Sequence, residues 1–325
     1  NGLIDMMNWG IIGFGRMGKQ YFDCFHQKNS KLKLVCISSK TKKNLPKNMN
    51  IEFFQSYSDL ISSNLVDAIY ISTLNNTHKN LVIEAINNDK KILCEKPLGL
   101  NYEEVKELDI KLKNKKNLLN EAIAYRAHPQ TRELLKILKD KEFGRIKAID
   151  SNFGFKVRKI KKDSRLFNKE VGGGSILDLG CYPISFFSLF SNNKEMKIIK
   201  SQHNMCETNV DIDGEISLKI NDEIDAHGTV SLRDNLNNFC KIYCENAQIT
   251  LSEPWLPQKK TFIEVETKSR YYKKIVSTNK SVYEHQIEAS TDFFSDKNPN
   301  LKLLIGIEQS LEISKIIDFW IKNNN

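Results

Sequence analysis

Six residues near the N-terminus, Gly13-Phe14-Gly15-Arg16-Met17-Gly18, constrain the fold more than any other segment. They end an apolar run that begins at Trp9 and open a helical pattern that extends to about Gln27. In this GxGxxG spacing the first glycine permits a tight turn, the second lets a ligand approach the backbone, and the third permits close packing of helix on strand. The N-terminus of such a helix faces the phosphates of a dinucleotide. We therefore predict a dinucleotide-binding turn formed by these residues; a glycine-rich turn without a ligand is the alternative.

The order of strands and helices predicts two domains. From Trp9 to Ala122, short apolar runs alternate with helical patterns, which is typical of a parallel sheet with crossover helices. After Pro129 the strands become longer and alternate apolar with polar residues, which indicates a mostly antiparallel sheet. We expect an α/β protein with a doubly wound Rossmann domain over residues 1–122 and an α+β domain over residues 123–325. The last helix, from about Leu301 to Lys322, could pack back on the first domain.

Composition and charge exclude several classes of protein. The 325 residues are 40% hydrophobic and 27% charged, which is typical of a globular protein. No apolar stretch approaches the roughly 20 residues of a membrane span, and no basic segment precedes an apolar run at the N-terminus, so we expect a cytoplasmic protein. The 7 cysteines form no CxxC pair, and we expect no metal site. The net charge of +9 accompanies no nucleic-acid-binding pattern, so we expect an anionic small ligand rather than DNA or RNA.

The end of the second predicted strand bears on the choice of cofactor. An Asp or Glu at this place usually binds the ribose 2′-hydroxyl of NAD, whereas small hydroxyl residues and a cation suit the 2′-phosphate of NADP. The chain has Ser38, Ser39 and Lys40 here, and no carboxylate. Because a carboxylate would repel the phosphate, we expect NADP, with NAD as the alternative. A solvated lysine run in a loop would give the same residues without a ligand.

Two further loops follow the fourth and fifth predicted strands. Ligands of an open α/β sheet lie beyond the carboxyl ends of its strands, so we expect cofactor contacts from Ser72, Thr73, Leu74, Asn75 and His78. A lone histidine that begins a helix is, however, more often a cap or a packed residue than a catalyst. The second loop is Glu95-Lys96-Pro97. Its lysine, held in a partly desolvated cleft, could donate a proton to a substrate oxygen, although this tripeptide is also common on surfaces.

A glycine run, Gly172-Gly173-Gly174, opens a further helical pattern in the second half of the chain. Glycines at this place suggest a backbone that a ligand approaches closely. Asp178 and Tyr182 are four residues apart and therefore share one helical face. A tyrosine beside a lysine and a cofactor can donate a proton to a carbonyl that accepts hydride, because the cation favours the ionised phenol. A helix N-terminus with a packed tyrosine is the alternative.

Together and in this order, these segments resemble the Gfo/Idh/MocA family of NAD(P)-dependent oxidoreductases. The similarity covers nearly the whole chain. It is most specific in the segments GFGRMG, STLNNTH, EKP and GGGSILDLGCYP. Three more segments are similar to the dimeric dihydrodiol dehydrogenase and glucose-fructose oxidoreductase branch of the family: residues 120–130, 163–168 and 253–257.

The resemblance implies catalytic roles for three residues and a cofactor contact for a fourth. Lys96 would be the catalytic lysine, and Glu95 and Lys96 would lie near the nicotinamide ribose. Tyr182 would be the acid/base, and Asp178 would orient the substrate. The inositol dehydrogenase branch has a histidine where this chain has Tyr182. This departure favours aldoses, ketosugars or nucleotide-linked sugars over a polyol such as inositol.

Other residues would surround the reacting groups. The resemblance implies that Arg165 and Tyr283 line the nicotinamide end. We expect the substrate pocket to include Tyr125, Arg126 and Trp255. The long export leader of the periplasmic members is not found in this sequence, which agrees with a cytoplasmic location.

These expectations combine into one predicted function. We predict an NADP-dependent oxidoreductase that interconverts a CH–OH group and a carbonyl on a sugar, nucleotide sugar or related cyclic diol by hydride transfer. The alternatives are a non-catalytic dinucleotide-binding sensor and a glycosidase that retains NAD. The sheet of the second domain, with one face covered by helices, predicts a homodimer or a tetramer. The sequence leaves the identity of the substrate and the physiological direction open.

Overall fold

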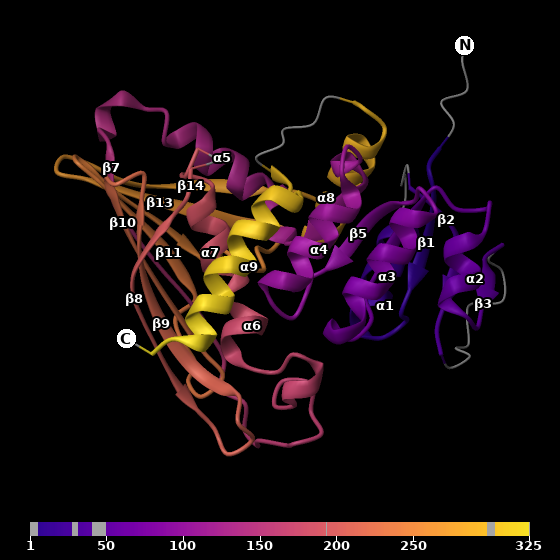
Figure 1. Ribbon diagram of the computed structural model, residues 1–325. Coiled ribbons are helices and arrows are strands. Elements are labelled where there is room, and N and C mark those ends of the chain that lie inside the picture. Colours follow the sequence, from indigo (N-terminus) through magenta and orange to yellow (C-terminus); the bar gives the residue numbers. More distant parts are fainter. Residues whose placement is uncertain (1–5, 28–31, 41–49, 193, 298–302, 325) are drawn as a thin grey trace, which may run out of the picture. The chain divides into compact units, whose positions relative to one another are not determined.

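The computed structural model describes residues 6–27, 32–40, 50–192, 194–297 and 303–324 (Figure 1). The chain forms two compact units. The first comprises Asn1–Gly99, Glu103–Ala122 and Tyr283–Ser310, and the second comprises Leu100–Tyr102, Ile123–Val282 and Leu311–Asn325. The predicted second domain, residues 123–325, therefore contains a segment that lies in the first unit. The reason is that α8 (Val282–Phe294) buries Ile287 and Phe294 in the core of the first unit.

A six-stranded parallel sheet forms the centre of the first unit and confirms the predicted Rossmann domain. The strand order is β3-β2-β1-β4-β5-β6, so the chain starts in the middle and winds outwards in both directions. The strands are β1 (Asn8–Ile12), β2 (Lys33–Ser38), β3 (Glu52–Phe54), β4 (Ala68–Ile71), β5 (Lys91–Glu95) and β6 (Leu119–Ala122). The helices of this part of the chain, besides α8, are α1 (Arg16–Phe25), α2 (Tyr57–Ser62), α3 (Asn75–Asn87) and α4 (Tyr102–Leu112).

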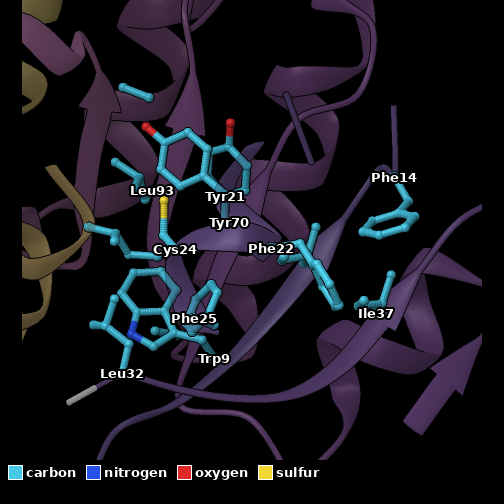
Figure 2. Close-up of a cluster of buried hydrophobic side chains, with 14 of the residues drawn as sticks. Trp9, Phe14, Tyr21, Phe22, Cys24, Phe25, Leu32, Ile37, Tyr70 and Leu93 are labelled. Carbon is cyan, nitrogen blue, oxygen red and sulfur yellow. The ribbon is translucent and has the colours of Figure 1, made fainter. Parts of the chain in front are cut away.

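Side chains on both faces of this sheet are buried, as in other parallel sheets. Side chains on one face form an apolar cluster with α1 and α8 (Figure 2). The cluster includes Trp9, Ile11, Phe22, Phe25, Ile37, Tyr70, Leu93, Ile287 and Phe294. Within it, Tyr21 of α1 stacks on Tyr70 of β4 with ring centroids 3.8 Å apart. On the other face, Gly10 leaves room for Leu60 of α2, since a Cβ on Gly10 would lie 3.0 Å from Cδ2 of Leu60.

The second unit contains an eight-stranded sheet that is mostly antiparallel, as predicted. Its order is β14-β13-β12-β11-β7-β10-β9-β8, and of its pairings that of β7 with β10 is parallel. The strands are β7 (Ile146–Gly154), β8 (Lys197–Met205), β9 (Asp211–Ile220), β10 (Ile224–Ser231), β11 (Phe239–Cys244), β12 (Ala247–Ser252), β13 (Lys260–Thr267) and β14 (Tyr271–Ser277). The helices are α5 (Pro129–Ile137), α6 (Ser175–Leu179), α7 (Cys181–Ser188) and the larger part of α9 (Ile307–Lys322). Short 3₁₀ turns cover Ala124–Ala127, Lys141–Phe143 and Lys169–Val171 in this unit and Lys116–Leu118 in the first unit.

From the sequence alone, strands of this sheet are expected at residues 146–155, 197–205, 213–220, 226–232, 239–244 and 262–266, which leaves β12 and β14 unpredicted. The first follows β11 after a turn of two residues, 245–246, and pairs with β11 as an antiparallel hairpin. The second lies at the edge of the sheet, where Lys273 and Lys274 are both exposed and interrupt the alternation. Residues 298–302 lie outside the described residues, and with them the predicted start of the last helix at Leu301.

One face of the eight-stranded sheet is covered by helices of the second unit, among them α6 and α7 (Figure 1). The alternation along β9 shows the two faces: Ile216 and Leu218 are buried, whereas Glu215, Ser217 and Lys219 are partly exposed. Of the helices that the structure describes, none is long and apolar enough to cross a bilayer.

Candidate active site

The turn between β1 and α1 has the geometry that the glycine spacing predicts. Gly13 has a φ of +88°, a conformation that favours glycine, and its amide donates a 2.9 Å hydrogen bond to the carbonyl of Ser38 in β2. A Cβ on Gly13 would lie 2.8 Å from the carbonyl oxygen of Ser72. A Cβ on Gly18 would lie 2.1 Å from the carbonyl oxygen of Gly13. Both positions are thus closed to larger residues by the protein's own backbone.

Gly15 lies in a different environment from the other two glycines. It is exposed, and a Cβ built on it meets no atom within 4 Å. It is also the N-cap of α1, where no side chain caps the helix and no acidic residue occupies the first turn. Open space above a backbone at an uncapped helix N-terminus fits the pyrophosphate of a dinucleotide.

The other predicted residues of this turn differ in their surroundings. Phe14 is buried and packs edge-on against Phe22, with ring centroids 5.5 Å apart. Met17 packs against the same apolar cluster, whereas Arg16 is exposed. Contact of the Phe14 and Met17 side chains with a cofactor stays a prediction, and the structure gives both a packing role.

The end of β2 carries the residues expected at the adenosine ribose. Ser38 is fully buried, and its hydroxyl has no hydrogen-bond partner among the described residues. Ser39 is 6% exposed, and its amide donates a 3.4 Å bond to the carbonyl of Phe54. Lys40 is exposed, and its backbone amide bonds to the phenol of Tyr57. Burial raises the pKa of this phenol, so it is protonated at neutral pH and can donate a hydrogen bond in turn.

The loop after β4 binds the glycine turn on one side and the loop after β5 on the other. The hydroxyl of Ser72 donates a 2.8 Å bond to the carbonyl of Gly13, and the hydroxyls of Thr73 and Thr77 lie 2.6 Å apart. Leu74 is 51% exposed at the N-cap of α3, and Asn75 is buried. The side chains of Ser72 and Thr73 therefore form hydrogen bonds within the protein.

His78 connects the two loops. Its ring is fully buried, with Nδ1 2.8 Å from the carbonyl oxygen of Pro97 and Nε2 3.3 Å from that of Thr73. Burial lowers the pKa of His78, and the nearby Lys96 lowers it further, against the hydrogen bonds to the two carbonyls. The ring is therefore neutral at pH 7. Its position fits a residue that joins the two loops better than one that contacts the cofactor directly.

The loop after β5 brings Glu95 and Lys96 to the same edge of the sheet. Both are partly exposed. The buried hydroxyl of Tyr70 donates a 2.6 Å hydrogen bond to Oε1 of Glu95. Tyr283 of α8 lies nearby: burial raises the pKa of its phenol and so does Glu95, while Arg16 and Lys96 lower it. The structure thus brings Arg16, Glu95, Lys96 and Tyr283 together in the first unit.

In the second unit, the glycine run is approached closely by the protein itself. A Cβ on Gly173 would lie 2.8 Å from the backbone of Asn168, and one on Gly174 would lie 2.5 Å from Oδ1 of Asp211. Asp211 is buried, and its Oδ2 accepts hydrogen bonds from the hydroxyl of Ser175 (2.7 Å) and the amide of Ile176 (2.6 Å). The glycines therefore serve the packing of the N-terminus of α6 on this carboxylate, and the expected close approach by a ligand is not needed to explain them.

Asp178 lies on α6 and Tyr182 on α7, so the one helix expected to carry both is divided at Gly180. Asp178 is 4% exposed and accepts a 2.9 Å hydrogen bond from the exposed Arg165, with which it forms an ion pair. Tyr182 is partly exposed and is surrounded by aromatic rings: the centroid of Phe153 lies 4.9 Å away, edge-on, and that of Trp255 lies 5.8 Å away. These contacts fix the ring of Tyr182 while part of it stays accessible.

The three residues expected at the substrate are buried behind Tyr182. Tyr125, Arg126 and Trp255 are each 1% exposed. The Tyr125 hydroxyl lies 2.9 Å from that of Ser185, and Arg126 Nη1 donates a 2.6 Å bond to the carbonyl of the same serine in α7. These contacts support α7, and contact of the three residues with a substrate stays a prediction.

Sequence reasoning gave no role to Tyr70, Glu121 and Asp211, which support the candidate site. Tyr70 lies in an apolar strand, where the sequence pattern predicts that a tyrosine is a core residue. Asp211 begins a strand 36 residues beyond Ser175, to which it bonds, and no local spacing links the two. Glu121 lies within the last strand of the first unit, β6, and a carboxylate inside a strand of a parallel sheet was the available signal in the sequence.

Comparison with known proteins agrees with this fold and these segments. The model of an oxidoreductase family with an NAD-binding Rossmann fold matches residues 7–123, and the model of the GFO/IDH/MocA C-terminal domain matches residues 131–250. The chain is 29% identical over 276 residues to trans-1,2-dihydrobenzene-1,2-diol dehydrogenase of Xenopus tropicalis, covering 81% of this chain and 80% of that protein. It is 26% identical over 257 residues to the enzyme of the same name from Sus scrofa, covering 77% and 76%.

Solved structures share the fold over almost the full length. A 3-ketoreductase from Actinomadura kijaniata, in complex with NADP and TDP-benzene, has a TM-score of 0.84 at 18% identity and covers 97% of each chain. An aldose-aldose oxidoreductase from Caulobacter crescentus has a TM-score of 0.82 at 15% identity, covering 97% of this chain and 96% of its own. With the two family models matched in sequence, the chain belongs to the Gfo/Idh/MocA family of NAD(P)-binding oxidoreductases.

Proposed function

We propose that this oxidoreductase uses NADP to interconvert a hydroxyl and a carbonyl on a sugar, nucleotide sugar or related cyclic diol. The observation that carries the proposal is Lys96, which lies partly exposed beside Glu95 and Tyr283 at the carboxyl edge of a dinucleotide-binding sheet. A protein that only senses a dinucleotide has no use for a proton donor at this place. When bound, the nicotinamide supplies or accepts the hydride.

The preference for NADP is supported by the end of β2. Lys40 offers an exposed positive charge, the Tyr57 phenol is bonded to its backbone, and Ser38 and Ser39 add hydroxyl groups. Segment 38–40 has no carboxylate that would repel a 2′-phosphate. The 3-ketoreductase with the same fold was crystallised with NADP. An NADP preference favours reduction as the physiological direction.

We assign the proton transfer to Tyr182 and Lys96. In the reduction, Tyr182 donates its phenolic proton to the carbonyl oxygen, and Lys96 supplies the positive charge that stabilises the developing anion. In the oxidation the same groups accept the proton from the hydroxyl. Asp178, which the Arg165 ion pair holds in place, accepts a hydrogen bond from a neighbouring substrate hydroxyl and so orients the substrate.

The substrate class follows from the rings around Tyr182 and from the relatives. The partly exposed ring of Tyr182, which packs edge-on against the buried Phe153, suits the apolar face of a cyclic substrate. The curated relatives are named for a cyclic diol, and two proteins of the same fold are named a 3-ketoreductase and an aldose-aldose oxidoreductase. All these names describe hydroxyl or carbonyl chemistry.

The proposal is tested by cofactor titration followed by turnover. Fluorescence titration with NADPH and NADH comes first, and a screen of keto-sugars, nucleotide sugars and cyclic diols follows. We expect tighter binding of NADPH and turnover of at least one compound that Lys96→Met abolishes, with NADPH affinity kept within a few fold. Binding without turnover of any compound would favour a dinucleotide sensor. Hydrolysis of a glycoside without net change in nicotinamide absorbance would favour a glycosidase.

We also propose that the chain forms a homodimer or a higher oligomer through the open face of the eight-stranded sheet. Along β10, β11 and β13 this face presents rings as well as polar groups, including His227, Tyr243 and Phe262, which are all partly exposed. A broad sheet face of this kind is suited to pair with a second copy of itself. Light scattering that gives a particle of 37.5 kDa, the mass of one chain, would contradict this proposal.

A further inference from the structure

Buried side chains from three other elements of the first unit form hydrogen bonds with the segment that carries Lys96. Before the lysine, Glu95 accepts a 2.6 Å hydrogen bond from the hydroxyl of Tyr70 in β4. After it, the carbonyl of Pro97 lies 2.8 Å from Nδ1 of His78 in α3. Both Tyr70 and His78 are fully buried. The lysine therefore projects from a loop that is fixed on both sides.

Glu121 of β6 is the third of these side chains, and it bears a carboxyl group. It is 4% exposed, and each of its oxygens has one donor. Oε1 accepts a 3.1 Å bond from the amide of Leu98, the second residue after Lys96. Oε2 accepts a 2.5 Å bond from the hydroxyl of Ser310 in the first turns of α9. The carboxylate thus ties the end of the Lys96 loop to the C-terminal part of the first unit.

Glu121 acts on Lys96 through its charge as well as through its hydrogen bonds. Burial raises the pKa of Glu121, and the bonds from Ser310 and Leu98 and the charge of Lys96 lower it in part. A carboxyl that accepts two hydrogen bonds beside an ammonium group is held as the anion better than its burial alone would allow. In return, a buried anion favours the protonated amine.

Among the described residues, the other titratable groups around this loop include Arg16 of α1, Tyr70 of β4, His78 of α3, Cys94 and Glu95 of β5, the partly exposed Glu104 of α4 beside Gly99, and Tyr283 of α8. Burial raises the pKa values of Tyr70, Cys94 and Tyr283 and lowers that of His78, so these four side chains are neutral at pH 7. Arg16 and Glu95 carry opposite charges. Glu121 is therefore the buried negative charge that compensates the positive charge of Lys96 from the interior of the first unit.

We propose that Glu121 is a positioning residue for Lys96: through Leu98 it fixes the loop that carries the lysine, and its buried charge keeps the amine protonated. The inference rests on the proposed function, because only a reaction that uses Lys96 gives this arrangement a catalytic effect. The charge on the amine can nevertheless be measured without any substrate.

The main variant is Glu121→Gln, which keeps the size of the side chain and an oxygen that accepts the amide of Leu98, but removes the charge. Ser310→Ala removes one donor and keeps the charge. The control is Glu312→Gln in the second unit, because Glu312 also accepts a backbone amide, that of Met196 at 3.0 Å, and burial also raises its pKa. A general effect of replacing a buried glutamate would appear in the control as well.

The first measurement is competitive acetylation of the full-length protein with acetic anhydride over a range of neutral to alkaline pH. Mass spectrometry of the peptide that contains Lys96 gives the pH at which half of this amine becomes reactive. We expect this midpoint to move to lower pH in Glu121→Gln and to stay unchanged in Glu312→Gln. An unchanged midpoint in Glu121→Gln would overturn the electrostatic part of the proposal.

The second measurement is steady-state turnover of whichever substrate the screen identifies. We expect kcat of Glu121→Gln to fall by about 10-fold to 100-fold, since small displacements of a catalytic group have effects of this size, with KM for NADPH within about threefold. The alkaline limb of the pH profile should move in the same direction as the acetylation midpoint. Unchanged kcat and pH profile in Glu121→Gln, with Lys96→Met inactive, would overturn the proposal and leave the proposed function standing.

Two further outcomes concern an active Lys96→Met variant and an unfolded Glu121→Gln variant. If Lys96→Met retains turnover, the proposed function fails, and the acetylation midpoint alone decides whether Glu121 controls the amine. If Glu121→Gln does not fold, Ser310→Ala provides the test: we expect a stable protein whose kcat is reduced severalfold with KM for NADPH unchanged. Wild-type kcat in Ser310→Ala would then overturn the positioning role.

Discussion

Gly18 lies so close to Gly13 that a Cβ added to Gly18 would stand 2.1 Å from the carbonyl oxygen of Gly13. A Cβ on Gly15, between them in the chain, would meet no atom within 4 Å. An alanine substitution should therefore reduce folding stability at Gly18 and leave it nearly unchanged at Gly15. We expect Gly18→Ala to lower the free energy of unfolding by about 1–3 kcal/mol, the usual cost of overpacking, or to prevent folding.

Gly15→Ala should unfold at nearly the wild-type urea concentration, because its methyl group enters open space. It should nevertheless weaken NADPH binding by at least about tenfold, since the methyl group occupies the place where the pyrophosphate approaches the backbone. Urea unfolding and fluorescence titration of both variants check the pair. Full NADPH affinity in a folded Gly15→Ala would place the cofactor elsewhere.

The hydrogen bond from Tyr70 to Glu95 provides a second prediction. Tyr70→Phe removes a buried donor to a carboxylate, and we expect a loss of about 1–2 kcal/mol in the free energy of unfolding, because Glu95 is partly exposed and can recover a bond from water. NADPH binding should weaken as well. Tyr271→Phe is the matched control: the Tyr271 hydroxyl donates to Glu264 at 2.9 Å on the surface, and its loss should cost less than about 0.5 kcal/mol. Equal effects of the two substitutions would contradict a special role of Tyr70.

The parts of the site that the sequence predicts are those whose chemistry lies within one short segment. The turn from Gly13 to Gly18 is recognisable because the strand, the glycine spacing and the helix are contiguous. The four-residue spacing of Asp178 and Tyr182 is local in the same way. The observed turn agrees with the expectation, whereas Asp178 and Tyr182 lie on two consecutive short helices, α6 and α7, instead of one.

The parts that the sequence does not predict depend on distant partners. The glycines before α6 read as a backbone for a ligand, but their close neighbour is Asp211, which a strand brings to them from 36 residues beyond Ser175. Tyr125 and Trp255 are each 1% exposed and turn their polar atoms to protein partners, a burial that the sequence does not predict, and their expected contact with a substrate stays a prediction. Composition does not distinguish these cases, since burial is decided by tertiary packing.

Lys40 provides a prediction for cofactor choice. Its side chain is exposed at the end of β2, and we expect Lys40→Ala to weaken NADPH binding about fivefold, because an exposed ion pair contributes roughly 1 kcal/mol or less. NADH, which lacks the 2′-phosphate, should bind as before. The difference between the two cofactors should shrink at high salt, which screens exposed charges. Lys106→Ala, which removes an exposed lysine of α4, serves as the control. An equal loss for NADPH and NADH would show that Lys40 does not contact the 2′-phosphate.

The buried ring of His78 predicts a dependence of stability on pH. Burial lowers the pKa of His78 below its usual value near 6.5, so above that value neither the folded nor the unfolded chain protonates this residue. As the pH falls below 6.5, the unfolded chain binds the proton first, and the folded state loses stability until the pH passes the lower folded value. His78→Asn removes this loss and can keep one donor for the Pro97 carbonyl. We therefore expect the wild type to be more stable than His78→Asn at about pH 8, and this advantage to shrink between about pH 6.5 and pH 5 in urea unfolding. A constant difference across that range would mean that the histidine is not held neutral between the two loops.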